Sequence, residues 1–232
     1  MERRTTADGL ELSCLGLGCW QFGSAGSDDY WGVEYTDELA NEMTAQAAKL
    51  GMTYFDTAED YAKGGSELQL GRAMKALEKN LGPDARKKLT IGSKILPNHC
   101  LGVRWHCAST CARLGVECID LYMVHWPMDV SSMAHFAGAH TASGGRDYAT
   151  TGEVDAASVP PVRKAFLELA QLQKEGRIKH VGVSNFGVKQ LAEALETGVT
   201  LSVNQLCYNL IFRAAEIEII PFCEAHGIGV LA

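Results

Sequence analysis

The feature that most constrains this chain is the repeated alternation of short hydrophobic segments with longer amphipathic ones. Near-continuous hydrophobic runs of this length are typical of strands buried on both faces of a parallel sheet. The predicted strands span residues 14–20, 52–58, 89–95, 119–125, 178–185, 201–209 and 228–232. The predicted helices span residues 37–50, 66–80, 101–114, 161–175, 187–197 and 213–226. Strands that alternate with helices in this way predict β-α-β units and an α/β fold with one parallel sheet.

Residues near the predicted helix ends support these boundaries. Thr36 can cap the first helix, which ends at Gly51. Ser66 and Gln69 have the spacing of a capping box, which predicts that the second helix starts close to Ser66. Before the first strand, the segment RRTTADGLELS contains an Asp-Gly turn and predicts a small hairpin.

One connection is longer than the others. Residues 129–160, between the fourth and fifth predicted strands, are rich in Ala, Ser, Gly, Thr and His and have no sustained hydrophobic period. We interpret this segment as an inserted surface loop. Because it follows the C-terminal end of a strand, it can also border the mouth of a site at that end of the sheet.

Composition limits the classes of function that suit the chain. With 232 residues, of which 47% are hydrophobic and 21% charged, it fits one globular domain with an ample core. A net charge of −7 without a dense basic tract argues against nucleic acid and anionic membranes as partners. The sequence contains no secretory signal and no run of about 18 apolar residues, so we expect a cytoplasmic protein without a membrane span.

The eight cysteines are scattered and include no CxxC pair, which predicts reduced thiols. Histidines and cysteines gather only in HCLGVRWHCASTC, residues 99–111, where Cys107 and Cys111 share one helix face. The paired ligand spacing of structural zinc sites is missing from this segment. We therefore expect helix packing here and no metal.

Polar side chains follow the strands at their C-terminal ends. Asp56 and Tyr61 follow the second strand, Lys94 ends the third and His125 ends the fourth. The next two strands end in or contain Ser184, Asn185, Asn204 and Gln205. Each residue alone has an ordinary explanation, such as helix capping or core packing. Because the C-terminal ends of parallel strands form the ligand face of α/β folds, five successive polar strand ends favour a functional site.

These residue types suit proton transfer to a carbonyl oxygen. A phenol has a reference pKa near 10 and is a weak acid at neutral pH. We expect Asp56 to pair with the buried Lys94, and the lysine charge to lower the pKa of Tyr61. A histidine can bind the substrate oxygen, while the hydride has to come from a cofactor because no side chain supplies one.

The chain resembles the aldo-keto reductase family in several linked motifs that occur in that family's order and spacing. Beside the lysine of the third strand, these motifs are DTAEDY (56–61), GGSELQLG (64–71), LYMVHWP (121–127), GRIKHVGVSNF (176–186) and NQLCYNL (204–210). The resemblance implies a (β/α)8 TIM-type barrel over residues 1–232, with about seven of the eight strands present. It also implies the NAD(P)H-dependent reduction of an aldehyde or ketone, a small-molecule carbonyl substrate.

The resemblance implies a role for each matching residue. Tyr61 would be the proton donor, Lys94 and Asp56 its tuning pair, and His125 the group that orients the substrate. The cofactor, NADP(H) with NAD as the alternative, would be bound by Gly18, Trp20, Asp56, Ser184, Asn185 and Gln205. The carbonyl pocket would be walled by Trp20, His125 and Trp126. No GxGxxG motif follows a strand, so the dinucleotide would lie across the barrel mouth.

The sequence departs from the family at its end. It stops at GIGVLA, inside the seventh strand, which implies a C-terminally truncated barrel with unpaired edges at the first and seventh strands. We expect such a chain to have weak or no reductase activity by itself. The alternatives are a non-catalytic nicotinamide-binding regulatory subunit and an inactive fragment on the same scaffold.

Overall fold

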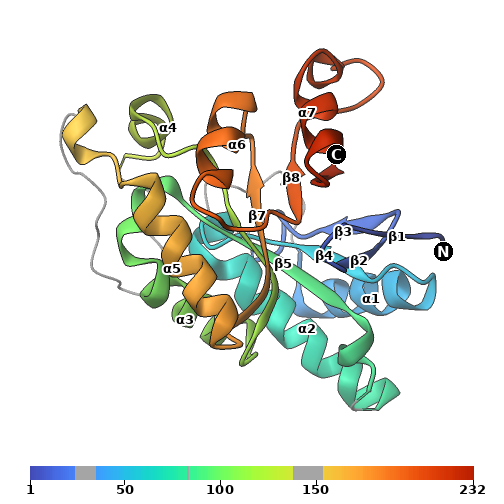
Figure 1. Ribbon diagram of the computed structural model, residues 1–232. Coiled ribbons are helices and arrows are strands. Elements are labelled where there is room, and N and C mark those ends of the chain that lie inside the picture. The colour runs from blue at the N-terminus through green and yellow to red at the C-terminus, as the bar shows by residue number, and fades with distance from the viewer. Residues whose placement is uncertain (24–34, 83, 138–153) are drawn as a thin grey trace.

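The main sheet of the protein is parallel and follows the order of the chain. A computed structural model describes residues 1–23, 35–82, 84–137 and 154–232. The strands of this sheet are β3 (Gly16–Gly18), β4 (Tyr54–Asp56), β5 (Thr90–Ile95), β6 (Ile119–Val124), β7 (Ile178–Ser184), β8 (Val203–Gln205) and β9 (Gly229–Leu231). All seven predicted strands are confirmed, with shorter bounds. The curled sheet and its flanking helices form part of a (β/α)8 barrel, as predicted (Figure 1).

The helices fill the connections between the strands. They are α1 (Asp37–Lys49), α2 (Gly65–Leu81), α3 (Val103–Leu114), α4 (Val130–His135), α5 (Val162–Lys174), α6 (Val188–Leu195) and α7 (Ile219–Ala225). Short 3-10 turns are η1 (Tyr61–Gly64), η2 (Arg86–Lys88), η3 (Pro97–Gly102), η4 (Ala156–Ser158) and η5 (Ala214–Glu216). The predicted cap of α1 is confirmed, because the Thr36 hydroxyl accepts a hydrogen bond from the backbone N–H of Leu39.

The predicted capping box of α2 is wrong. The helix begins at Gly65, after a left-handed Gly64, and Ser66 lies inside its first turn. The Ser66 hydroxyl donates to the carbonyl of Cys19 and shares a 2.7 Å hydrogen bond with the Thr57 hydroxyl. Ser66 is fully buried, so its hydroxyl needs partners within the protein, and neighbouring strands supply them. The helix is therefore fixed to β3 and β4 by tertiary contacts instead of by a local cap.

Two further segments differ from prediction. The single helix expected over residues 213–226 is divided into η5 and α7, with Pro221 in the first turn of α7, where its missing N–H costs no helical hydrogen bond. In the segment 129–160, which we interpreted as a loop, Asp129 caps the short helix α4 by accepting from the N–H of Ser132. Residues 138–153 of that segment lie outside the described residues.

The core has an inner and an outer part. The outer part packs the sheet against its helices, with Phe166 and Tyr122 among the fully buried side chains. The inner part fills the barrel and contains alternate residues of β4, β6 and β8 together with two leucines of the N-terminal hairpin: Tyr54, Leu121, Met123, Val203, Leu10 and Leu12. This arrangement in layers from alternate strands is typical of barrel interiors.

The predicted N-terminal hairpin is present and covers one end of the barrel. Its strands β1 (Arg3–Thr5) and β2 (Glu11–Ser13) pair antiparallel. The carboxylate of Asp8, in the turn, accepts hydrogen bonds from the Ser202 hydroxyl and from Nδ1 of His180, 2.9 Å away. Ser202 precedes β8 and His180 lies in β7. The hairpin therefore lies against the N-terminal ends of the strands, and the opposite end stays available for a site.

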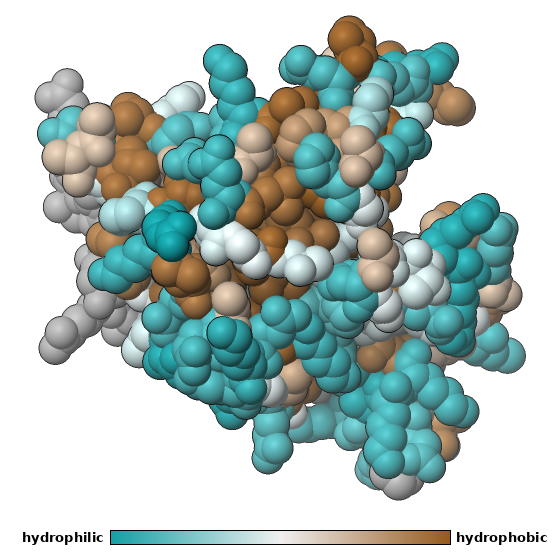
Figure 2. Space-filling model, viewed as in Figure 1, coloured by the Kyte–Doolittle hydropathy of each residue, from teal (hydrophilic) through white to brown (hydrophobic). Residues whose placement is uncertain are grey.

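The two outermost strands, β3 and β9, end the sheet, and within the described residues no strand pairs with their outer edges. Hydrophobic side chains gather around α6 and β8 on the face shown in Figure 2. After β8, Leu210 and Ile211 are 97% and 95% exposed. Among the described residues, no helix combines the length and hydrophobicity that a membrane span requires.

Candidate functional site

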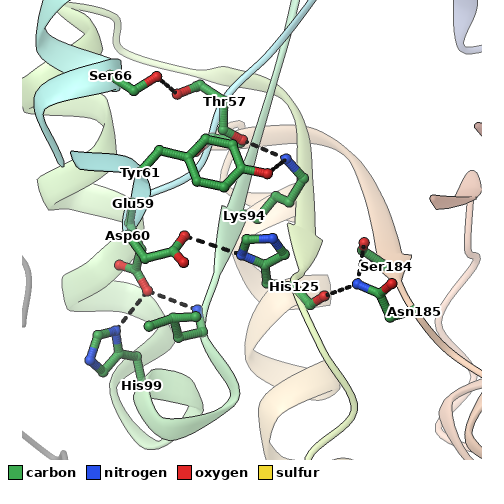
Figure 3. Close-up of polar contacts among 12 residues, drawn as sticks. Thr57, Glu59, Asp60, Tyr61, Ser66, Lys94, His99, His125, Ser184 and Asn185 are labelled. Carbon is green, nitrogen blue, oxygen red and sulfur yellow. Dashed lines mark hydrogen bonds and ion pairs between the residues drawn. The ribbon is translucent and has the colours of Figure 1, made fainter. Parts of the chain in front are cut away.

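The centre of the candidate site is the ammonium group of Lys94 in β5, whose side chain is 1% exposed. Its Nζ donates to Oδ2 of Asp56 at 2.7 Å. It also donates to the carbonyl of Thr57 at 2.9 Å and to the hydroxyl of Tyr61 at 3.1 Å (Figure 3). An ammonium has three donors, and each has an acceptor here. The predicted pair of Lys94 and Asp56 is therefore confirmed, and Tyr61 lies beside it.

These contacts keep Lys94 charged. Burial alone would lower the pKa of Lys94, but the charge of Asp56 and the hydrogen bonds to Asp56 and Tyr61 outweigh it and raise that pKa above the usual value. A buried ammonium is tolerated because it is paired and fully hydrogen-bonded. The site therefore holds a fixed positive charge 4.7 Å from the centre of the Tyr61 ring.

Asp56 is held from its other side by Tyr54, a residue that our sequence analysis missed. The Tyr54 hydroxyl donates to Oδ1 of Asp56 at 2.9 Å, so each carboxylate oxygen of Asp56 has a different partner. Tyr54 lies two residues before Asp56 in β4 and therefore on the same face of the strand, which was the available signal. Its ring lies against Gly16 and Gly92, where a side chain would overlap it.

Tyr61 stands at the start of a tightly turned loop. Ala62, Lys63 and Gly64 all have left-handed backbone conformations, with φ of 49°, 53° and 90°. Such a run is rare for residues with a side chain, and it turns the chain sharply between β4 and α2. The loop is also anchored to β5, since the N–H of Glu59 donates to the carbonyl of Lys94.

The pKa of Tyr61 differs from our expectation. Lys94 lowers it, as predicted, but burial has the larger effect and the net result is a pKa above the usual value of 10. The negative charges of Asp56 and Asp60 act in the same direction as burial. Tyr61 is therefore a neutral phenol at neutral pH and carries a proton that it can give away.

His125 faces the ring of Tyr61. The two rings are 5.5 Å apart between centroids and meet edge to face at 76°. Nδ1 of His125 lies 3.2 Å from Oδ1 of Asp60, in a contact whose geometry falls short of a hydrogen bond. Nε2 of His125 has no hydrogen-bond partner among the described residues. Asp60, which our sequence analysis also missed, therefore restrains one side of the imidazole and leaves the other available.

Aromatic side chains surround this pair. Trp20, 44% exposed, lies 6.1 Å from the Tyr61 ring, and Trp126, 36% exposed, lies 6.0 Å from Phe136. Phe136 also stacks on His125 at 6.4 Å. It lies directly after α4, so part of the segment 129–160 borders the site. Sequence reasoning did not single out Phe136, because nothing in that segment has the period of a packed element.

The predicted cofactor residues of β7 and β8 lie side by side. The Ser184 hydroxyl donates to the carbonyl of Gln205. Nδ2 of Asn185 donates both to Ser184 Oγ and to the carbonyl of His125, each at 3.0 Å (Figure 3). Asn185 has a left-handed backbone with φ of 62°. Within the described residues, Oδ1 of Asn185 and the side-chain amide of Gln205 have no partner. These groups remain available to a ligand at the C-terminal strand ends.

Gly18 ends β3 next to Asp56, its register partner in β4. A Cβ added at Gly18 would meet no atom of the described residues within 4 Å, so these residues leave space beside this strand end. A cavity of about 520 Å³ adjoins the other side of the site and is lined by Trp126, Asn185 and Phe212, among others. The candidate site thus has open space next to both groups of predicted cofactor residues.

Comparison with known proteins shows that the chain is similar to aldo-keto reductases. The model of the aldo/keto reductase family matches residues 14–232. An NADH-specific methylglyoxal reductase and methylglyoxal reductase YeaE, both from Escherichia coli, are 26% and 27% identical over 95% and 96% of the chain. Aldo-keto reductase YhdN of Bacillus subtilis is 29% identical over the whole chain. The chain spans 63%, 64% and 61% of the lengths of these relatives.

Solved structures have the same fold. A thermostable aldo-keto reductase in complex with the inhibitor epalrestat superposes with a TM-score of 0.76 at 27% identity, over all of this chain and 72% of that one. The aldose reductase of Schistosoma japonicum superposes with a TM-score of 0.75 at 23% identity, over all of this chain and 68% of that one. The curled seven-stranded sheet therefore matches part of a complete barrel.

Proposed function

The chain belongs to the aldo/keto reductase family, and from this membership we propose that it forms the catalytic part of an enzyme that reduces aldehydes or ketones to alcohols. The observation that carries the proposal is the buried contact of the Lys94 ammonium with both Asp56 and the Tyr61 hydroxyl. This arrangement places a phenol proton next to a fixed positive charge. A carbonyl oxygen that gains negative charge needs both.

In the proposed reaction, the Tyr61 hydroxyl gives its proton to the carbonyl oxygen of the substrate. The O–H bond of Tyr61 breaks, the substrate gains an O–H bond, and Tyr61 is left as a phenolate. Lys94 stabilises that phenolate through the 3.1 Å hydrogen bond, and Asp56 keeps Lys94 charged and oriented. A proton from solvent then restores the phenol.

His125 would orient the substrate. Its Nε2, which has no partner in the described part of the chain, can donate a hydrogen bond to the carbonyl oxygen, while Asp60 limits rotation of the ring from the Nδ1 side. The aromatic rings of Trp20, Trp126 and Phe136 would exclude water from this point. We propose that these rings select a carbonyl group flanked by small or apolar substituents.

The residues present fit a nicotinamide cofactor, which when bound supplies the hydride to the carbonyl carbon. The oxygen of Asn185 and the side-chain amide of Gln205, which have no partner among the described residues, match the donors and acceptor of a carboxamide. Ser184, through its hydrogen bonds, would hold Asn185 in place. Open space at Gly18 and the cavity beside Asn185 leave room for such a group across the strand ends.

Methylglyoxal, a small 2-oxoaldehyde, is the first substrate to assay, because two relatives from E. coli are named for its reduction. One of these is described as NADH-specific, so NADH and NADPH have to be compared directly. The test monitors oxidation of each cofactor by the purified protein with methylglyoxal and with a panel of larger aldehydes. Cofactor oxidation that depends on an aldehyde supports the proposal. Cofactor binding without turnover on any aldehyde would favour a non-catalytic nicotinamide-binding protein instead.

A further inference from the structure

Behind the catalytic loop lies a second cluster of titratable side chains, which the proposed reaction does not use. It consists of Glu59 in the loop after β4, His99 in η3 and His106 in α3. Nδ1 of His99 lies 2.7 Å from Oε1 of Glu59, and Nδ1 of His106 lies 2.7 Å from Oε2 (Figure 3 shows Glu59 and His99). The two imidazoles stack at 4.1 Å with an angle of 11° between their planes.

The cluster is buried, and no lysine or arginine in the described part of the chain forms an ion pair with Glu59. Glu59 is 0% exposed and each histidine 2%. Two buried cationic side chains from neighbouring parts of the sequence form ion pairs with other carboxylates. Lys94 pairs with Asp56, and Arg113 pairs with Glu67. Within the described residues, the polar partners of the Glu59 carboxylate are the two imidazoles and the N–H of Leu96. A buried carboxylate charge without a cation is costly, so this one needs a proton or a metal ion to balance it.

Other details point toward a ligand. Each carboxylate oxygen of Glu59 lies 2.7 Å from Nδ1 of one imidazole, so both oxygens face the pair of histidines. Nε2 of His106 is buried and has no hydrogen-bond partner among the described residues. With both imidazoles neutral and Glu59 ionised, the cluster carries one negative charge and, within the described residues, no lysine or arginine pairs with it.

We propose that Glu59, His99 and His106 form a site for a divalent transition-metal ion such as Zn²⁺. One potential ligand atom from each of the three residues lies within 4.8 Å of the others. Two imidazole nitrogens and one carboxylate oxygen are a common zinc ligand set, whereas Mg²⁺ and Ca²⁺ prefer oxygen ligands. A water molecule would complete a tetrahedral shell, as in other sites with three protein ligands.

Metal binding requires small changes in the cluster. Zinc–ligand bonds of about 2.0–2.1 Å separate tetrahedral ligand atoms by roughly 3.4 Å. The 2.7 Å contacts therefore have to widen by about 0.7 Å. Each imidazole then offers the Nδ1 lone pair and carries its proton on Nε2. An imidazole that starts as imidazolium releases one proton when the ion binds.

The position of the site gives the ion a structural role near the reaction centre. Glu59 directly precedes Asp60, which contacts His125, and lies two residues before Tyr61. An ion held by Glu59, His99 and His106 would fix the catalytic loop to η3 and α3. This role does not depend on the proposed reductase activity, because it concerns binding and folding.

The test measures metal uptake by the whole chain. Because the three side chains are nearly inaccessible, the protein is unfolded in urea and refolded with Zn²⁺, Co²⁺, Mg²⁺ or no metal, and loosely bound ions are removed by gel filtration. We expect one tightly held Zn²⁺ per chain, a tetrahedral Co²⁺ absorption spectrum, and no retained Mg²⁺. Saturating Zn²⁺ at about 100 times its dissociation constant should raise the melting temperature by about 5–10 °C.

Variants assign the ion to this cluster. Glu59→Gln keeps the size of the side chain and should lose the Co²⁺ spectrum and the thermal shift, and His106→Asn should do the same. The double variant Cys14→Ser/Cys207→Ser removes the two exposed thiols and should bind like the parent protein. No tight uptake by the refolded parent protein, or equal uptake by the Glu59→Gln variant, would overturn the proposal. Circular dichroism of each variant shows whether it has folded.

Discussion

At the scale of single residues, the site depends on a proton that stays on Tyr61. The sign of the pH dependence follows from the raised pKa of this phenol. The neutral form is the donor, so the donor is fully present at neutral pH and is lost only as pH rises through the raised pKa. Lys94 keeps its charge over the same range because its pKa is also raised. Below pH 10 the site therefore contains both the neutral Tyr61 phenol and the charged Lys94 ammonium.

We predict that ionisation of Tyr61 does not lower kcat for carbonyl reduction at any pH below 10, the usual pKa of a tyrosine. Above pH 10, kcat should fall as Tyr61 loses its proton. The measurement is kcat against pH under saturating cofactor and aldehyde, with protein stability checked at each pH. A fall in kcat that reports an ionisation of Tyr61 near pH 7 would mean that the lysine charge outweighs burial.

The neighbours of Tyr54 give a second prediction at this scale. A Cβ at Gly92 would lie 2.5 Å from the Tyr54 hydroxyl, so Gly92→Ala should displace the ring and remove its hydrogen bond to Asp56. We expect a loss of about 1–3 kcal/mol in the free energy of unfolding, together with a lower kcat. Gly18→Ala is the matched control for stability, since its Cβ meets nothing within 4 Å. Equal stability of the two variants would show that Tyr54 can move without cost.

At the scale of elements, one carboxylate ties three strands and a turn together. Asp120 in β6 accepts from Arg86 of η2 at 2.8 Å, from the N–H of Ile91 in β5 at 2.9 Å and from Lys179 of β7 at 2.7 Å. Burial alone would raise the pKa of Asp120, but these partners lower it below the usual 3.8. The stabilisation is therefore present above pH 3.8 and is lost as pH falls through the lowered pKa.

We predict that Asp120→Asn costs about 3 kcal/mol of unfolding free energy at pH 7, because it leaves Arg86 without its buried partner. Urea unfolding at pH 7 and at pH 3 measures this, and the difference between the parent and the variant should shrink at the lower pH. Asp84→Asn breaks only the exposed ion pair with Lys87 and should leave stability unchanged. A difference that stays constant with pH would argue against the carboxylate charge as its source.

Much of the fold is predictable at this scale because each strand carries its own signal. Runs such as residues 119–125 are hydrophobic on both faces, and the strand found there, Ile119–Val124, is buried throughout. The strand order follows from the short right-handed connections of β-α-β units. Asp56, Lys94 and His125 are predicted together because parallel strands end at the same edge of the sheet.

What could not be predicted depends on contacts between distant segments. Ser66 has the local pattern of a cap, but buried partners at Cys19 and Thr57 decide its role. Glu59 joins His99 and His106 from about 40 positions away in sequence, and no spacing rule covers such a cluster. The net shift of the Tyr61 pKa depends on the extent of burial, which requires the fold.

At the scale of the whole molecule, the N-terminal hairpin links the two halves of the sheet. Asp8 bonds to both β7 and the residue before β8, and Leu10 and Leu12 fill the barrel next to Tyr54. We predict that Asp8→Ala lowers the free energy of unfolding by about 1.5–3 kcal/mol, the contribution of hydrogen bonds to a charged group. Urea denaturation measures it, with Glu2→Gln as the exposed control. If the urea midpoint of the Asp8→Ala variant equals that of the parent protein, the packing of Leu10 and Leu12 alone fixes the hairpin to the barrel.

The central claim is that Tyr61 donates the proton in a carbonyl reduction. The most direct measurement compares kcat of the parent protein and of Tyr61→Phe with methylglyoxal and NADH or NADPH, with cofactor affinity measured separately by fluorescence. Tyr35→Phe, at a ring that packs on Phe22, is the matched control. We predict that Tyr61→Phe lowers kcat by about 10²- to 10⁴-fold while cofactor affinity and the control stay unchanged. Full activity of the Tyr61→Phe variant would contradict the account.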